Sequence, residues 1–120
     1  MQMGRTSSMR RHAIPLVLWT LLWALFFFTI LAGTEHLPAG DFSGQFHAFG
    51  LFQARELAQG QLPTWSPGSH AGVPFVADTQ AAVFYPLRAA TVLLSLPWGF
   101  SYLALELEAL LHVWLAGVFT

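Results

Sequence analysis

The chain contains no cysteine and no lysine, and it carries little charge of either sign. Without cysteine it can form neither disulfides nor thiolate metal sites, and it offers no thiol nucleophile. Its five arginines are spread over 120 residues, too thinly to follow a phosphate backbone, which excludes a basic nucleic-acid binder. Only 9% of the residues are charged, against about 25% in an ordinary soluble domain.

Apolar and aromatic residues take the place of charge. Hydrophobic residues make up 55% of the chain, with 11 Phe and 5 Trp, which excludes a disordered polar chain. A usual protein surface, of which about 25–35% is charged, cannot be built from this composition. The sequence therefore predicts an all-α, polytopic membrane protein.

The first apolar run covers residues 13–33 and contains no ionisable side chain. About 20 such residues suffice to cross a bilayer core of about 30 Å, so a transmembrane helix is expected here. Arg5, Arg10 and Arg11 precede it, which predicts a cytoplasmic tail over 1–12 in a plasma-membrane protein. A cleaved signal peptide is the alternative, but its apolar core is usually only about 7–15 residues long.

Residues 34–98 are expected to form an extracytoplasmic loop. Phe42, Phe46 and Phe49 follow helical spacing, which predicts an interfacial helix over 41–60. Four prolines between 63 and 86 then favour turns and extended segments.

The second apolar region allows two interpretations. One is a membrane helix over 87–105, kinked at Pro97. The other is a short interfacial helix over 87–96, a turn at 97–99 and a second transmembrane helix over 99–120. The second is favoured because 99–120 has membrane length. This run is still apolar at Phe119, next to the last residue, which predicts that the chain is the N-terminal piece of a longer protein.

Glu108 and His112 stand four residues apart in the predicted helix over 99–120. They share one helix face, whereas Glu106 points nearly the opposite way. Ionisable residues inside a membrane helix are expensive and indicate function, so the two form a candidate intramembrane polar pair. The alternative is that the acidic residues lie near the headgroups and only form hydrogen bonds between helices.

Four linked elements carry a family resemblance. They are Asp41-x-x-x-Gln45, Gly60-x-Leu62-Pro63-x-Trp65-x-Pro67, Gly72-x-Pro74-Phe75-x-Ala77-Asp78-x-Gln80 and Phe84-Tyr85-Pro86-Leu87. Together they resemble the first extracytoplasmic loop of bacterial YfhO-like membrane proteins, which are similar to the wider GT-C class of glycosyltransferases. The resemblance extends to a Leu111-His112 to Gly117 stretch, and Ser66 stands where the family usually has Asn.

The resemblance implies a GT-C-like helical bundle that transfers sugar from a polyprenyl-phosphate donor to a cell-envelope acceptor. Asp41 matches the acidic residue of the family's first outer loop, which implies a general base or a ligand of a divalent cation. A helix N-cap is the structural alternative for Asp41. The further substrate-binding candidates are Gln45, Trp65, Asp78, Gln80, Tyr85 and Arg88.

Structural roles are the alternatives for these candidates. Asp78 fits a turn, the aromatic residues fit an interfacial belt, and Arg88 fits a side chain that extends toward lipid headgroups. His47 and His70 are expected to be loop or interface residues, because neither has a second histidine at metal-ligand spacing. Two other classes stay open: a non-catalytic transporter-like or scaffold protein, and a small two-helix membrane protein.

Overall fold

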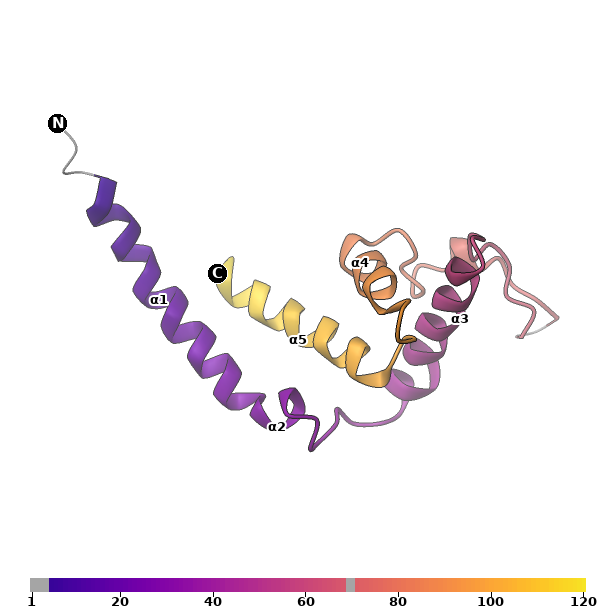
Figure 1. Cartoon of the computed structure of the whole chain (residues 1–120), viewed down its shortest axis with the longest axis horizontal. Coiled ribbons are helices and arrows are strands. Elements are labelled where there is room, and N and C mark those ends of the chain that lie inside the picture. Colours follow the sequence, from indigo (N-terminus) through magenta and orange to yellow (C-terminus); the bar gives the residue numbers. More distant parts are fainter. Residues whose placement is uncertain (1–4, 69–70) are drawn as a thin grey trace. The chain divides into compact units, whose positions relative to one another are not determined.

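The structure is a computed structural model that describes residues 5–68 and 71–120, with side chains from His12 onward. Within these ranges the chain is mostly helical, and Figure 1 gives the order of the elements. Two compact units can be distinguished. One consists of Met1–His36 and Ala109–Thr120, and the other of Leu37–Glu108. His70 lies outside the described residues.

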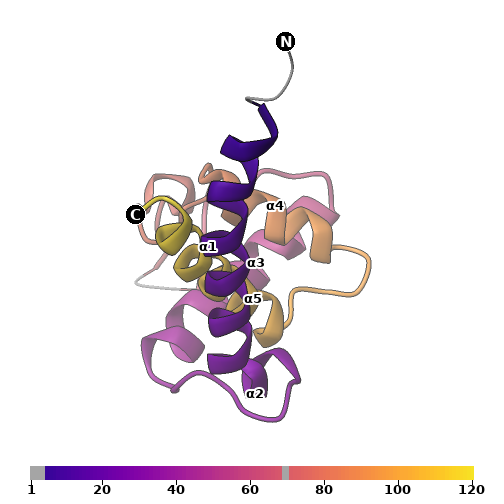
Figure 2. The ribbon, with the colours of Figure 1, turned by 90° about the vertical axis from the view of Figure 1, so that its left-hand side faces the viewer.

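The first unit contains α1 (Arg5–Phe26), α2 (Phe28–Leu31) and the C-terminal part of α5 (Tyr102–Val118). Phe27 separates α1 from α2, because its backbone lies at φ −98° and ψ 16°, far from helical ψ. The chain leaves the direction of α1 at this point (Figures 1 and 2). Gly33 then ends α2 at φ +70°, and Thr34 N–H donates to Thr29 O at 2.9 Å. This is the glycine stop that the sequence predicts.

Tryptophan side chains connect α1 to α5 within this unit. The indole N–H groups of Trp19 and Trp23 donate to the carbonyls of Trp114 and Leu110, at 2.9 and 3.0 Å. The Trp114 indole donates in return to Thr20 Oγ1 at 3.0 Å. Three long-range hydrogen bonds therefore fix the two helices against each other.

The predicted membrane-spanning helices are wrong. No helix in the described part of the chain is long and apolar enough to cross a membrane. The α1 helix begins among the basic residues and ends at Phe26, so its apolar part from Ala13 covers only about 21 Å. The α5 helix has 17 residues, about 26 Å, and includes two buried glutamates. The polytopic membrane fold, the plasma-membrane localisation and the membrane keywords built on these helices are corrected with them.

The second unit holds the remaining elements. They are η1 (Phe42–Phe46, a π-helical turn), α3 (His47–Ala58), η2 (Phe75–Ala77, a 3₁₀ turn), α4 (Pro86–Ser95) and α5 up to Glu108. The predicted helix over 41–60 corresponds to η1 and α3. The predicted short helix over 87–96 corresponds to α4, which Pro86 begins at the favourable first position.

Pro97 and Gly99 lie between α4 and α5, with Gly99 at φ +83°, so a single helix over 87–105 kinked at Pro97 is not formed. Two apolar clusters fill the interior of the second unit. The first joins α3, α4 and α5 through Ala54, Val92, Phe100 and Leu105. The second packs the connecting segment against α3 through Phe75, Ala81 and Val83.

Candidate functional site

A polar cluster joins two segments of the second unit that are distant in sequence. Gln45 Nε2 donates to Gln80 Oε1 at 2.6 Å, across 35 positions of the chain. Asp78 Oδ1 accepts the backbone N–H of Gln80 at 2.8 Å, which is the Asx turn that an aspartate favours. The structure thus brings together three of the predicted site residues. With Asp41 we refer to them below as the Gln45–Gln80 cluster.

Asp41 stands immediately before η1, about one turn from Gln45, and its side chain is exposed. Its backbone is already helical, at φ −61° and ψ −30°, and its carboxylate makes no capping hydrogen bond. The helix N-cap alternative therefore lacks the hydrogen bond that defines it. The carboxylate is instead accessible to a ligand.

The π turn sets the spacing between Asp41 and α3. His47 N–H bonds to Phe42 O, five residues back, instead of the four of an α-helix. Gly40, at φ +102°, leads into this turn and accepts Gly44 N–H at 2.8 Å. Single π turns are rare and occur frequently at functional sites.

Two predicted aromatic residues lie exposed in the connecting segment. Trp65 is 55% exposed and Tyr85 is 43% exposed. The Trp65 indole lies over Gly72, where a Cβ atom would come within 3.0 Å of the ring. Ser66 and Val73, the chain neighbours of Trp65 and Gly72, exchange two backbone hydrogen bonds of 2.9 Å, which fix the backbone at these two residues. Exposed aromatic faces of this kind can stack on an apolar face of a ligand.

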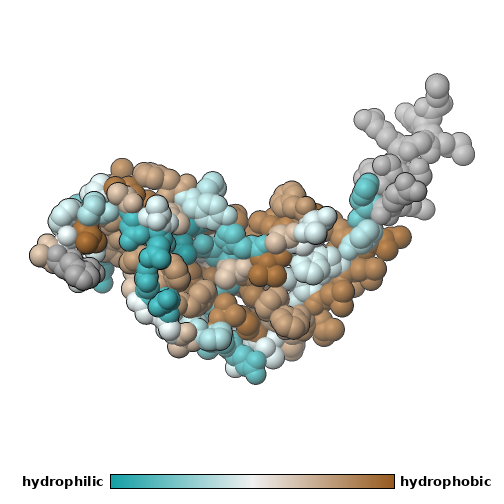
Figure 3. All heavy atoms as spheres, turned by 180° about the vertical axis from the view of Figure 1, so that it is seen from behind, coloured by the Kyte–Doolittle hydropathy of each residue, from teal (hydrophilic) through white to brown (hydrophobic). Residues whose placement is uncertain are grey.

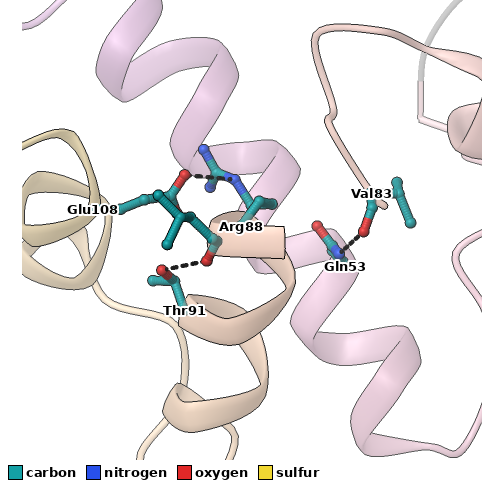
Figure 4. A network of polar contacts seen from close by, with 6 residues as sticks. Gln53, Val83, Arg88, Thr91 and Glu108 are labelled. Atoms are coloured by element: carbon teal, nitrogen blue, oxygen red, sulfur yellow. Dashed lines mark hydrogen bonds and ion pairs between the residues drawn. The ribbon is translucent and has the colours of Figure 1, made fainter. Parts of the chain in front are cut away.

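Arg88 lies in the interior of the unit, where its side chain is buried. Its Nε lies 3.3 Å from Glu108 Oε1, and both side chains are buried. Figure 4 shows the guanidinium of α4 directed at the carboxylate of α5. The guanidinium carbon also lies 5.8 Å from the centre of the Phe100 ring. The structure therefore pairs Arg88 with Glu108, a contact between two helices that spacing along one helix does not predict. The pair of Glu108 and His112 stays a prediction.

Two further buried polar residues have roles that the sequence analysis does not predict. Glu106 is fully buried, and its Oε1 accepts Leu37 N–H at 2.6 Å. Tyr102 OH donates to the carbonyl of the same Leu37 at 3.2 Å. Gln53 Nε2 donates to Val83 O at 3.3 Å (Figure 4). Glu106 and Gln53 thus each fix a loop through a hydrogen bond to its backbone. Their signal in the sequence is only that polar residues occupy positions of otherwise apolar helices.

Groups of His, Asp and Glu side chains commonly bind metal ions. In the part of the chain that the structure describes, no three such side chains come together as a group that could hold an ion. His47 packs its ring 5.4 Å from Tyr102 and 6.0 Å from Phe100, which is a packing role. Asp41 therefore belongs to no such group among the described residues.

Comparison of the chain with family models, curated proteins and solved structures found no match. The resemblance to YfhO-like and GT-C proteins stays a prediction.

Proposed function

We propose that the Gln45–Gln80 cluster binds the sugar of a polyprenyl-phosphate-linked donor and that Asp41 is the general base for glycosyl transfer. The observation that carries this proposal is the hydrogen bond of 2.6 Å between Gln45 and Gln80. It joins two residues that the motif resemblance selects independently of any structure. Asp78 holds the backbone of one of them.

The chemistry of the cluster suits a hydroxyl-rich ligand. One side-chain amide hydrogen bond leaves the Gln45 carbonyl and the Gln80 amino group for further hydrogen bonds. A sugar presents both donors and acceptors, and the exposed Trp65 and Tyr85 rings offer apolar surface for its C–H face.

In the proposed reaction Asp41 takes the proton of an acceptor hydroxyl group. The acceptor oxygen forms a bond to the anomeric carbon as that carbon loses its bond to the phosphate oxygen. The electron pair of the broken bond leaves with polyprenyl phosphate, and the proton ends on the Asp41 carboxylate. A positioned carboxylate of this kind contributes about 10²–10⁴-fold to a rate.

The test is release of polyprenyl phosphate from a polyprenyl-phosphate hexose, measured together with hexose binding. Asp41→Asn should lower transfer more than about a hundredfold and leave hexose binding unchanged, because only the base is lost. Gln80→Ala should weaken hexose binding. Gln59→Ala, which alters an exposed glutamine at the end of α3, is the control and should change neither. Unchanged transfer by Asp41→Asn contradicts the role of Asp41 as base.

A second candidate is a helical scaffold that associates through α1, and one observation favours it. Exposed apolar side chains repeat at helical spacing along α1, including Leu18, Leu21 and Leu25, which is 75% exposed. Figure 3 shows this apolar surface in brown along the helix that follows the grey N-terminal residues. Contiguous apolar surface commonly marks a protein–protein contact.

Association of two copies through this surface can be tested by analytical ultracentrifugation. Leu21→Glu should shift a dimer to monomer, because burial of a carboxylate in an apolar contact is costly. Thr29→Glu, at an exposed polar position of α2, is the control. A monomer for the unaltered chain contradicts the scaffold candidate.

A further inference from the structure

An apolar hollow of about 280 Å³ opens on the surface of the second unit. It lies between the C-terminal part of α3 and the segment that joins α4 to α5. Its lining includes Leu51, Ala54, Ala58, Leu96 and Phe100, with Arg55 at its edge. None of these residues belongs to the Gln45–Gln80 cluster.

The hollow exists because two small side chains stand one turn apart on α3. Ala54 and Ala58 line it where longer side chains would fill it. Its Phe100 wall is held in place, since a Cβ atom on Gly50 would come within 3.0 Å of that ring and Arg88 covers the ring at 5.8 Å. Collapse of the hollow would require Phe100 to leave this packing.

Arg55 places a positive charge at the edge of the hollow. Of the arginine side chains that the structure describes, Arg88 is buried against Glu108, whereas Arg55 is exposed. Within the described residues, no carboxylate lies within ion-pair distance of Arg55. An apolar hollow with one exposed guanidinium at its edge is complementary to an apolar chain with an anionic end.

We propose that this hollow binds a medium-chain fatty acid, with its hydrocarbon chain in the hollow and its carboxylate on Arg55. A guanidinium and a carboxylate form paired, charge-assisted hydrogen bonds. The volume lies just below the range of roughly 300–1,000 Å³ for small-molecule sites, which suits one short chain better than a multi-ring ligand. The apolar lining removes the hydrocarbon chain from water, and this transfer supplies the favourable free energy of binding.

The test is isothermal titration calorimetry of the whole chain with decanoate and with decanol, which has the same hydrocarbon chain and no charge. Decanoate should bind more tightly than decanol by about tenfold or more, equivalent to one bound ionic contact. Arg55→Gln should remove this preference and leave decanol binding unchanged. Equal affinity for the two probes overturns the proposal, because the occupant would then be merely apolar.

A matched pair of substitutions separates the hollow from the rest of α3. Ala58→Leu should fill the hollow and abolish decanoate binding. Ala48→Leu makes the same change at an exposed position of α3 outside the lining and should have no effect. Circular dichroism of both variants verifies that the helix is intact. Decanoate binding that survives Ala58→Leu, or that is lost in both variants with the helix intact, overturns the assignment.

Discussion

At the scale of single residues, the buried charges of the second unit define its interior. Arg88 and Glu108 face each other at 3.3 Å with little access to water. Two charges removed from water stabilise a fold only while each compensates the other, so loss of one partner costs far more than replacement of both.

This asymmetry gives a first prediction. Arg88→Met should lower the free energy of unfolding by roughly 3–5 kcal/mol, because it leaves a buried carboxylate without its guanidinium. The double variant Arg88→Met with Glu108→Leu should recover most of that loss. Urea denaturation followed by circular dichroism measures both. A loss of less than about 1 kcal/mol in the single variant, the level of an exposed ion pair, would contradict the burial seen here.

Two helical glycines give a second prediction, with opposite signs. A Cβ atom at Gly50 would meet the Phe100 ring within 3.0 Å, so Gly50→Ala should destabilise the chain by about 1–3 kcal/mol through overpacking. A Cβ atom at Gly44 would meet nothing within 4 Å. Gly44→Ala should therefore stabilise by about 0.5–1 kcal/mol. Thermal unfolding of the two variants should shift in opposite directions, and equal shifts would contradict the packing of Phe100.

At the scale of elements, periodicity predicts which segments are helical. The aromatic spacing over 41–60 indicates η1 with α3, and the apolar residues over 87–96 indicate α4. The π turn η1, directly before α3, has no such signal. A backbone hydrogen bond to the fifth residue back differs from one to the fourth residue back only in local geometry. The helix is also interrupted at Phe27, within Phe26-Phe27-Phe28, and no glycine or proline there indicates the end of a helix.

The contact of α1 with the C-terminal part of α5 gives a third prediction. A Cβ atom at Gly117 would come within 3.0 Å of the Trp19 indole, whose N–H bonds to Trp114 O. Gly117→Leu should therefore displace Trp19 and break that hydrogen bond, at a cost of about 1–3 kcal/mol. The tryptophan signal in near-ultraviolet circular dichroism should decrease. Ala116→Leu, one residue away and exposed, should leave both stability and signal unchanged.

At the scale of the whole molecule, composition alone predicts a membrane fold that the helices in the described part of the chain do not form. A count of apolar residues shows how much hydrophobic surface exists, but it does not show where helices end. The apolar stretch over 13–33 is divided at Phe27, and α5 contains buried glutamates. The same stretch leaves large apolar side chains exposed on α1.

The candidate site could be predicted only in part. The resemblance selected Gln45, Asp78 and Gln80, and the structure connects them through hydrogen bonds. The contact of Glu108 with Arg88 could not be predicted, because spacing along one helix identifies only neighbours within that helix. Arg88 reaches Glu108 from another helix, and that contact depends on how α4 and α5 pack.

The most direct test of the central claim is a hexose titration of the isotope-labelled chain, followed by nuclear magnetic resonance. We expect the side-chain amide signals of Gln45 and Gln80 and the backbone signal of Asp41 to shift together along one binding curve. The Gln59 side-chain amide should not move. Gln80→Ala should lower the affinity for hexose by about tenfold. Signals of the Gln45–Gln80 cluster that stay fixed at saturating hexose would contradict the account.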